Sequence, residues 1–186
     1  MPSFNKNIIK YMVIIGIFLV IVGFVQVKGF ILSEKDMENM KNIQIITGQT
    51  DIEGEGIIVT VADKDLKDRE KIVYDTDIIT IVNILEHAGA EAISVNNERV
   101  ISTNKIKVNK MKIKINNNEY DSPFVIKAIG HPKTLSDAFN PRVLSEVNGF
   151  NLIKDYIIIN IEKKDKLIIP KYKGNIAFKY AKPIKK

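Results

Sequence analysis

The richest group of polar side chains in this sequence lies in one short segment between two apolar stretches. Glu91 is followed by Asn96, Asn97, Glu98 and Arg99, and the two asparagines stand where a tight turn is expected. A strand and its turn can present these side chains together, and the planar guanidinium of Arg99 can hold a carboxylate with two parallel hydrogen bonds. The segment is therefore the first candidate for contact with a ligand or a partner.

A structural interpretation of the same residues competes with the functional one. Asparagine is common in turns because its side chain bonds nearby backbone groups. Arg99 can equally form a bridge with Glu91 that stabilises the fold and binds nothing. Both interpretations predict a strand or hairpin over residues 92–101.

The sequence contains two histidines and no cysteine, so few side chains could bind a metal or act as a nucleophile. His131, next to Pro132, is a further candidate contact, but it lies far from His87 and neither has ligand partners at a recognisable metal spacing. The absence of cysteine removes disulfides, thiolate metal sites and cysteine nucleophiles. No nucleophile motif or pair of catalytic carboxylates appears. We therefore predict a protein that is not an enzyme, with no catalytic residues, no metal and no cofactor.

Two further motifs resemble ligand sites, but local structure explains them better. Residues 54–56 (GEG) precede a predicted strand, whereas phosphate loops open a helix, and their acidic residue would repel phosphate. Asp63 begins an aspartate-rich loop like that of a calcium site. Asp68, however, stands where that loop needs glycine, and Tyr74 where it needs a bidentate glutamate. A solvated acidic loop is the better interpretation.

The formal net charge of +6 is distributed unevenly. Residues 1–28 carry +3, residues 29–161 carry −4, and residues 162–186 carry +7. Only three arginines and no tryptophan are present, which argues against a nucleic-acid partner. The basic residues 171–186 are predicted to form an extended or frayed tail, which either touches anionic polymers or lipid or only improves solubility.

A long apolar run near the N-terminus predicts a transmembrane helix. Residues 11–27 are uncharged and lie between Lys10 and Lys28, and apolar residues continue past both lysines. We place the span at 11–32, with Lys10, Tyr11, Val27 and Lys28 as its interfacial anchors. A cleaved signal peptide is the alternative, but no small-residue cleavage site follows the run. The charge bias predicts a cytoplasmic segment 1–10, an external C-terminal domain, a location in the cell membrane and the lipid bilayer as a partner.

The remaining residues predict a connector at 33–54 and one folded domain at 55–170. Helical spacing within 33–49 is compatible with a short helix of about three turns. Two stretches have helical periodicity: one begins at Asp75 or Thr76 and stops at Gly89, and the other runs through Leu135 and Phe139 with a second turn at Val143, Leu144 and Val147. The predicted strands are 57–62, 92–101, a lysine-alternating ribbon over 106–115, 124–129 and 156–161, the last followed by a turn at 163–165 and a return at 167–169.

This order of elements predicts the α+β class. We expect a mixed, mostly antiparallel sheet with two helices on one face, in a ferredoxin-like β-α-β-β-β-α-β order, preceded by one transmembrane helix.

Four stretches resemble the bacterial domain of unknown function 881 family: GEGIIVTVAD, DIITIVNILEHAGAEAISVNNERVIS, PFVIKAIGHPKTL and the late LIIP. The resemblance covers about residues 48–172, and residues 83–99 are its most specific part. It implies an N-terminal membrane span followed by a coiled coil, for which the connector here is too short, and a role in the cell envelope. Some members of the family are associated with cell division or sporulation. The resemblance supplies no catalytic residues.

Two hypotheses of function follow. The first is a membrane-anchored scaffold or protein-interaction module outside the cytoplasm, with other envelope or division proteins, or weakly a second copy, as its partners. The second is an external domain that binds or acts on envelope glycan or a small molecule, which requires a concave pocket with polar groups such as Asn96, Arg99 or His131.

Overall fold

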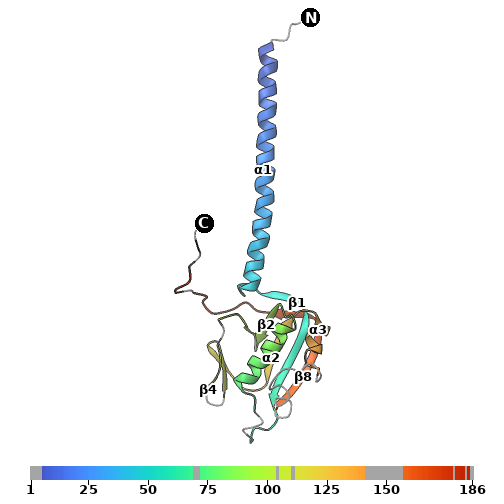
Figure 1. The fold of residues 1–186 in the computed structure, drawn as a ribbon, viewed down its shortest axis with the longest axis vertical. Helices are drawn as coiled ribbons and strands as arrows, with labels where there is room; N and C mark the ends of the chain where they lie inside the picture. The colour runs from blue at the N-terminus through green and yellow to red at the C-terminus, as the bar shows by residue number, and fades with distance from the viewer. Residues whose placement is uncertain are drawn as a thin grey trace. The chain divides into compact units, whose positions relative to one another are not determined.

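The chain folds into two compact units, Met1–Gln44 and Ile45–Lys186. The computed structural model describes residues 6–68, 72–103, 105–109, 112–140, 157–177, 179–182 and 184. The first unit is helical and the second contains all of the β-structure (Figure 1).

In the described residues, the first unit consists of a single long helix, α1 (Lys6–Ile46). It continues without a break through residues 33–46, where the sequence suggested a separate short helix. The helix stops just before Gly48, whose backbone φ of +70° suits glycine because a side chain is strained there.

The predicted transmembrane helix is wrong for the residues that the structure describes. Within these residues, no helix combines the length and the apolar character that crossing a membrane requires. The prediction placed a span over 11–32 with Lys10, Tyr11, Val27 and Lys28 at its ends. The wholly apolar part, residues 11–25, extends only about 22 Å at 1.5 Å per residue, short of a hydrocarbon core of about 30 Å.

The second unit is built on a five-stranded antiparallel sheet. Its strands are β1 (Ile52–Asp63), β2 (Ala92–Val95), β3 (Glu98–Arg99), β7 (Phe124–Ile129) and β8 (Ile157–Ile169). The strand order is β3-β2-β7-β1-β8, and all four neighbouring pairs are antiparallel. Without β3, this is the ferredoxin-like arrangement, in which β1 lies between the third and the last strand of the motif. The α+β class with an antiparallel sheet is therefore confirmed.

The second unit contains both predicted helices, and α2 begins and ends close to the predicted residues. In α2 (Asp75–His87) the Asp77 carboxylate accepts the Tyr74 N–H at 2.7 Å, and Gly89 with a φ of +86° follows the last turn. Burial raises the pKa of Asp77, an effect that the hydrogen bond from Tyr74 opposes. The second helix, α3 (Pro132–Asp137), is short. The predicted second turn at 143–147 lies outside the described residues.

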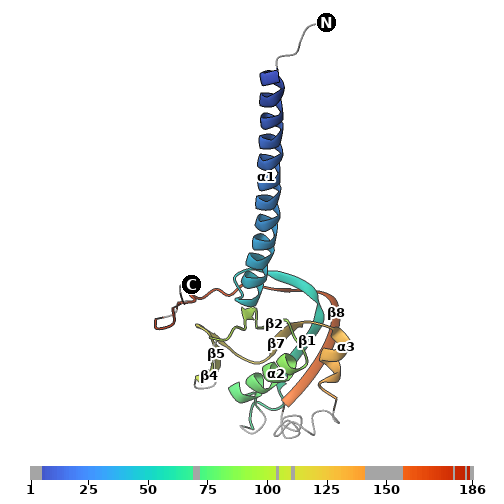
Figure 2. The same cartoon turned by 45° about the horizontal axis from the view of Figure 1, so that its top comes forward.

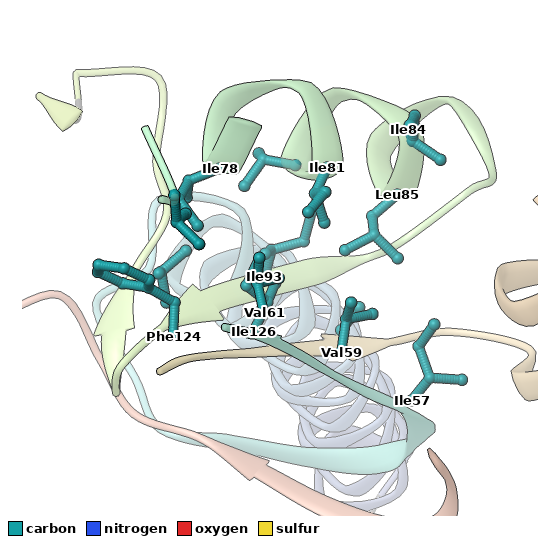
Figure 3. Packing of buried hydrophobic residues seen from close by; sticks show 14 of the residues in the cluster. Ile57, Val59, Val61, Ile78, Ile81, Ile84, Leu85, Ile93, Phe124 and Ile126 are labelled. Carbon is teal, nitrogen blue, oxygen red and sulfur yellow. The ribbon is translucent and has the colours of Figure 1, made fainter. Parts of the chain in front are cut away.

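One apolar cluster holds both helices on the same face of the sheet. Figure 3 shows Ile81 and Leu85 of α2 directed towards strand residues such as Val59. Leu135 of α3 belongs to the same cluster and is fully buried, as is Ile126 at the centre of the sheet. Burying one such side chain stabilises the fold by about 1.5–3 kcal/mol, so this cluster is the main source of stability.

A second, three-stranded sheet is inserted between β3 and β7. It comprises β4 (Ile106–Asn109), β5 (Lys112–Ile115) and β6 (Asn118–Tyr120), in that order. Ile113 and Ile115 are buried and Lys112 is exposed, as the alternation of apolar residues with lysine predicts for β5, but Lys114 is half-buried and Val108 of β4 is 45% exposed. Figure 2 shows β4 and β5 on one side of α2, with α3 and β8 on the other.

The last strand differs from the prediction. β8 is one continuous strand of 13 residues instead of a strand, a turn and a return. It pairs with β1 along nearly its whole length, and a register shift opposite Gly54 and Gly56 accommodates one extra residue. Its charged residues 162–166 suggested a turn, but they are exposed at the edge of the sheet, where charge is common.

The beginning of the basic tail is held against the domain. The Lys171 N–H donates to the Asp51 carboxylate at 2.6 Å, and the Tyr172 N–H donates to the Gly48 carbonyl at 2.7 Å. Residues 171 and 172 are therefore held by hydrogen bonds of their backbone N–H groups, which the prediction of an extended or frayed tail did not include.

Candidate functional site

The β2–β3 hairpin carries most of the predicted contact residues, and its turn forms as expected. Asn96 and Asn97 are its two central residues, with φ values of 49° and 63°. Positive φ at both positions is the signature of the tight hairpin turn that matches the twist of the strands, and asparagine tolerates it better than most residues. The turn is followed directly by Glu98 and Arg99.

Asn96 and Asn97 bind the neighbouring strand β7. The Asn96 side-chain oxygen accepts the Val125 N–H at 2.7 Å, and the Asn96 N–H donates to the Val125 carbonyl at 2.9 Å. The Asn97 side-chain oxygen accepts from the Lys127 ammonium at 3.0 Å. Asn96 therefore extends the pairing of β2 with β7 by one step, whereas Asn97 adds an exposed side-chain contact with β7.

Glu98 is a buried carboxylate that joins the two sheets. Its side chain is nearly inaccessible, with 4% of the residue exposed. One carboxylate oxygen accepts from the Asn118 amide at 2.7 Å and from the Tyr120 hydroxyl at 3.0 Å, and the other from the Asn116 amide at 3.3 Å. The pKa of Tyr120 is raised, first by burial and then by the hydrogen bond and the charge of Glu98. The charge is thus satisfied by neutral donors of the β5–β6 hairpin.

Arg99 points to the opposite face of the same short strand. It pairs with Ser94 across the hairpin, on the face away from Glu98 and Val95. The guanidinium Nη2 donates to the backbone carbonyl of Ile45 at 2.9 Å, and burial lowers the pKa of Arg99. This contact of Arg99 is with a backbone carbonyl, and neither interpretation of the sequence predicted it.

Glu91 and His131 lie at the other end of β2 from the turn. Glu91 is exposed, and its N–H donates to the Ile129 carbonyl at 2.9 Å. His131 is also exposed and caps α3, with its Nδ1 3.1 Å from the Thr134 hydroxyl oxygen. The structure therefore does not gather the six predicted contact residues into one site. Glu98 and Arg99 are buried on opposite faces of β3. Asn96 and Asn97 follow the C-terminal end of β2, whereas Glu91 and His131 lie near its N-terminal end.

Sequence analysis missed the partners of Glu98. Asn116, Asn118 and Tyr120 are about 20 residues further along the chain, and the three consecutive asparagines 116–118 signalled only a turn. No pattern in the sequence indicates that this turn contacts the β2–β3 hairpin. The acidic loop, by contrast, behaves as a loop. The Asp63 carboxylate accepts the Val73 N–H at 2.7 Å, and the Asp65 carboxylate accepts the Lys67 N–H at 2.9 Å.

Two hollows on the surface have linings that do not include Glu98 or Arg99. In the part of the chain that the structure describes, no three histidine, aspartate or glutamate side chains are placed so that they could hold a metal ion. One hollow of about 290 Å³, called the lysine hollow below, is lined by Lys105, Lys107, Lys114, Asn116 and Asn117. Another of about 320 Å³ lies at Asp63, Asp121 and Ser122. The lysine hollow is suited to binding an anion, because its charged groups are all cations.

The fold and these contacts define a small α+β domain of ferredoxin-like strand order, whose buried charged residues tie its parts together. The chain belongs to the family described as bacterial protein of unknown function (DUF881), whose model matches residues 39–182. This confirms the resemblance drawn from residues 48–172.

About half of the chain is similar to curated proteins named UPF0749. The chain is 29% identical to UPF0749 protein YlxW of Bacillus subtilis over 109 residues, which are 56% of this chain and 47% of that protein. It is 31% identical to UPF0749 protein Rv1823 of Mycobacterium tuberculosis over 110 residues, which are 53% of this chain and 36% of that protein. The match thus spans about half or less of the length of these relatives.

A solved structure shares the fold. The chain superposes on the crystal structure of an uncharacterized conserved protein from Mycobacterium tuberculosis with a TM-score of 0.63 and 22% sequence identity. The match covers 78% of this chain and 99% of the solved one. At this identity the likeness establishes the fold alone.

Proposed function

We propose that the second unit is a non-catalytic interaction module, which binds an extended segment of a partner protein along the outer edge of β8. The observation that carries the proposal is the position of this 13-residue strand at the end of the sheet order. Among the described residues, no strand pairs with its outer side. Such an edge offers a row of backbone donors and acceptors that an extended peptide can continue.

The side chains along β8 define the partner segment. Ile158 and Ile168, close to the two ends, have 51% and 56% of their surface exposed. Between them, Lys164 pairs with Glu162 at 2.8 Å, and Lys166 pairs with Glu53 on β1 at 2.8 Å. Charge at an edge disfavours indiscriminate strand pairing. A matching partner would therefore have apolar residues at both ends and charged residues between them.

The roles of the buried charges support binding over catalysis. Glu98 and Arg99, the strongest polar candidates, hold neighbouring segments of the domain. Neither of them lines the two hollows described above. The cellular setting is part of the proposal: the family resemblance favours a role in division, envelope assembly or sporulation.

Site-specific crosslinking in the native host tests this proposal. A photo-crosslinking amino acid at the exposed Asn160 should capture a defined partner, whereas one at the exposed Ile79 of α2 should not. The changes Ile158→Asp and Ile168→Asp should abolish the capture at Asn160 without lowering the melting temperature. Capture of the same proteins from both positions, or capture that survives both aspartates, would show that β8 is not the binding edge.

One observation favours a second candidate function, the binding of a small ligand. It is the lysine hollow, which collects cations and amides beside the three-stranded sheet. That hollow is independent of β8, because it shares no residue with that strand.

A further inference from the structure

The lysine hollow gathers positive charge that the rest of the sheet does not neutralise. Lys107 on β4 lies directly opposite Lys114 on β5, so that two like charges occupy one cross-strand pair. Such a pair is destabilising relative to a neutral one. Lys105 lies immediately before β4 and lines the same hollow. In the described residues, no ion pair involves any of these three ammonium groups.

In the described residues, other charged residues on this face of the three-stranded sheet have partners, unlike the three lysines of the hollow. Lys112, two residues before Lys114 on β5, forms an ion pair with Asp121 at 2.7 Å. Glu119 lies opposite Lys114 on β6, but its carboxylate accepts a hydrogen bond from the Asn109 amide instead. The carboxylates of Asp121 and Glu119 thus lie near the lysine hollow, but they bind Lys112 and Asn109 and not its three lysines.

The turn between β5 and β6 forms part of the lining of the lysine hollow, and hydrogen bonds hold this turn in place. The Asn116 N–H donates to the Lys105 carbonyl at 2.9 Å, and the Asn116 amide reaches Glu98 at 3.3 Å. The turn is therefore tied both to β4 and to the main sheet. The amide groups of Asn116 and Asn117 line the hollow together with the lysines and can add neutral donors to the charged ones.

The hollow continues into a second one of about 340 Å³. The two share Lys105, Asn116 and Asn117, and the second is completed by residues that include Thr103, Tyr172 and Asn175. No carboxylate lines either hollow among the described residues. The continuous surface is thus longer than one small anion requires, and it offers only cations, amides, hydroxyls and backbone.

We propose that the lysine hollow binds a multiply charged oxyanion, with phosphate or carboxylate groups distributed over Lys105, Lys107 and Lys114. Lysine binds phosphate well as a point charge, and each of the three ammonium groups offers three donors. The bound anion relieves the repulsion between Lys107 and Lys114, which gives binding a favourable contribution beyond the new contacts. We expect the charged groups of the anion to be spaced along a chain, because the lysine hollow extends into the second hollow.

Calorimetric titration of the full chain with tripolyphosphate and with citrate tests the proposal. Both probes carry several oxyanion groups, and the tighter one identifies phosphate or carboxylate as the preferred chemistry. The variant with Lys107→Gln and Lys114→Gln together should bind the preferred probe about five- to tenfold more weakly, because two exposed charge contacts are lost. Lys112→Gln on the same strand is the matched control and should change the affinity less than twofold.

A second measurement separates loss of the site from loss of the fold. The preferred probe should raise the melting temperature of the unsubstituted protein but not that of the double variant. Without the probe, the double variant should melt at the same or a higher temperature, since a like-charge pair has been removed. The proposal is overturned if neither probe binds at millimolar concentration, or if Lys112→Gln weakens binding as much as the double change.

Discussion

The two sheets of the second unit are stabilised in different ways. The five-stranded sheet buries a continuous apolar face beneath α2 and α3, with Ile126 and Leu85 inaccessible to solvent. The three-stranded sheet contributes a few isoleucines to that core. It is also joined through the Glu98 carboxylate, which accepts from three of its side chains, and through the Asp75 carboxylate of α2, which accepts the Val108 N–H at 2.8 Å. Apolar burial is non-directional and large, whereas a hydrogen-bonded carboxylate is directional and modest. The larger sheet therefore provides most of the stability of the fold. The smaller sheet is held in a defined position on it and can carry a binding surface.

The largest expected effect comes from the core of the larger sheet. Leu85→Ala should reduce the free energy of unfolding by about 2–5 kcal/mol, because it leaves a cavity at a fully buried position. Chemical denaturation measures the loss. Ile79→Ala on the same helix, where the side chain is 39% exposed, should cost much less. Equal losses at the two positions would mean that α2 does not hold the sheet by apolar burial.

The attachment of the smaller sheet should respond to a change at Glu98. Glu98→Ala removes the acceptor of the part-buried hydrogen bonds from Asn118 and Tyr120 and should cost about 1–3 kcal/mol. Hydrogen exchange should accelerate most in β5 and β6, and much less in β7. Glu98→Gln retains one acceptor oxygen and should have an intermediate effect. Exchange that rises equally in both sheets would contradict the comparison.

The two turn asparagines of the β2–β3 hairpin allow a finer test. Asn96→Gly keeps the positive φ accessible but removes the acceptor of the part-buried Val125 N–H, so it should cost about 1 kcal/mol. Asn97→Gly removes only an exposed contact with Lys127 and should leave stability almost unchanged. Thermal unfolding of the two variants measures the difference. The reverse order would show that Asn96 does not extend the larger sheet.

The smallest effect is an alkaline titration of Tyr120. Burial and Glu98 raise the pKa of Tyr120 above its unfolded value of 10.0, so the folded state holds this proton more tightly than the unfolded state. This tyrosine therefore contributes stability that is present below pH 10 and is lost as the pH rises through the folded pKa. Ultraviolet absorbance should show one late-ionising tyrosine that disappears in Tyr120→Phe. In Glu98→Gln its pKa should fall but stay raised, since burial is the larger cause.

Much of the fold could be predicted because its signals are local. The helical spacing from Ile78 to Leu85, the stop at Gly89 and the Asn96–Asn97 turn each depend on residues close in sequence. β8 was divided wrongly because its charged middle resembles a turn, and only the long pairing with β1 keeps it extended. The uncharged run 11–27 predicted a membrane span, but within the described residues no helix is both long and apolar enough to cross a membrane.

The candidate site, too, was only partly predictable from the sequence. The sequence by itself determined the class of fold, the turn residues and the side chains available for binding, since these depend on residue type and short spacing. Only the tertiary structure decided that Glu98 and Arg99 are buried on opposite faces of one short strand. It also decided that Lys107 and Lys114 oppose each other beside Lys105. The physical reason is that contacts between distant segments depend on strand register and sheet order, which short-range patterns do not specify.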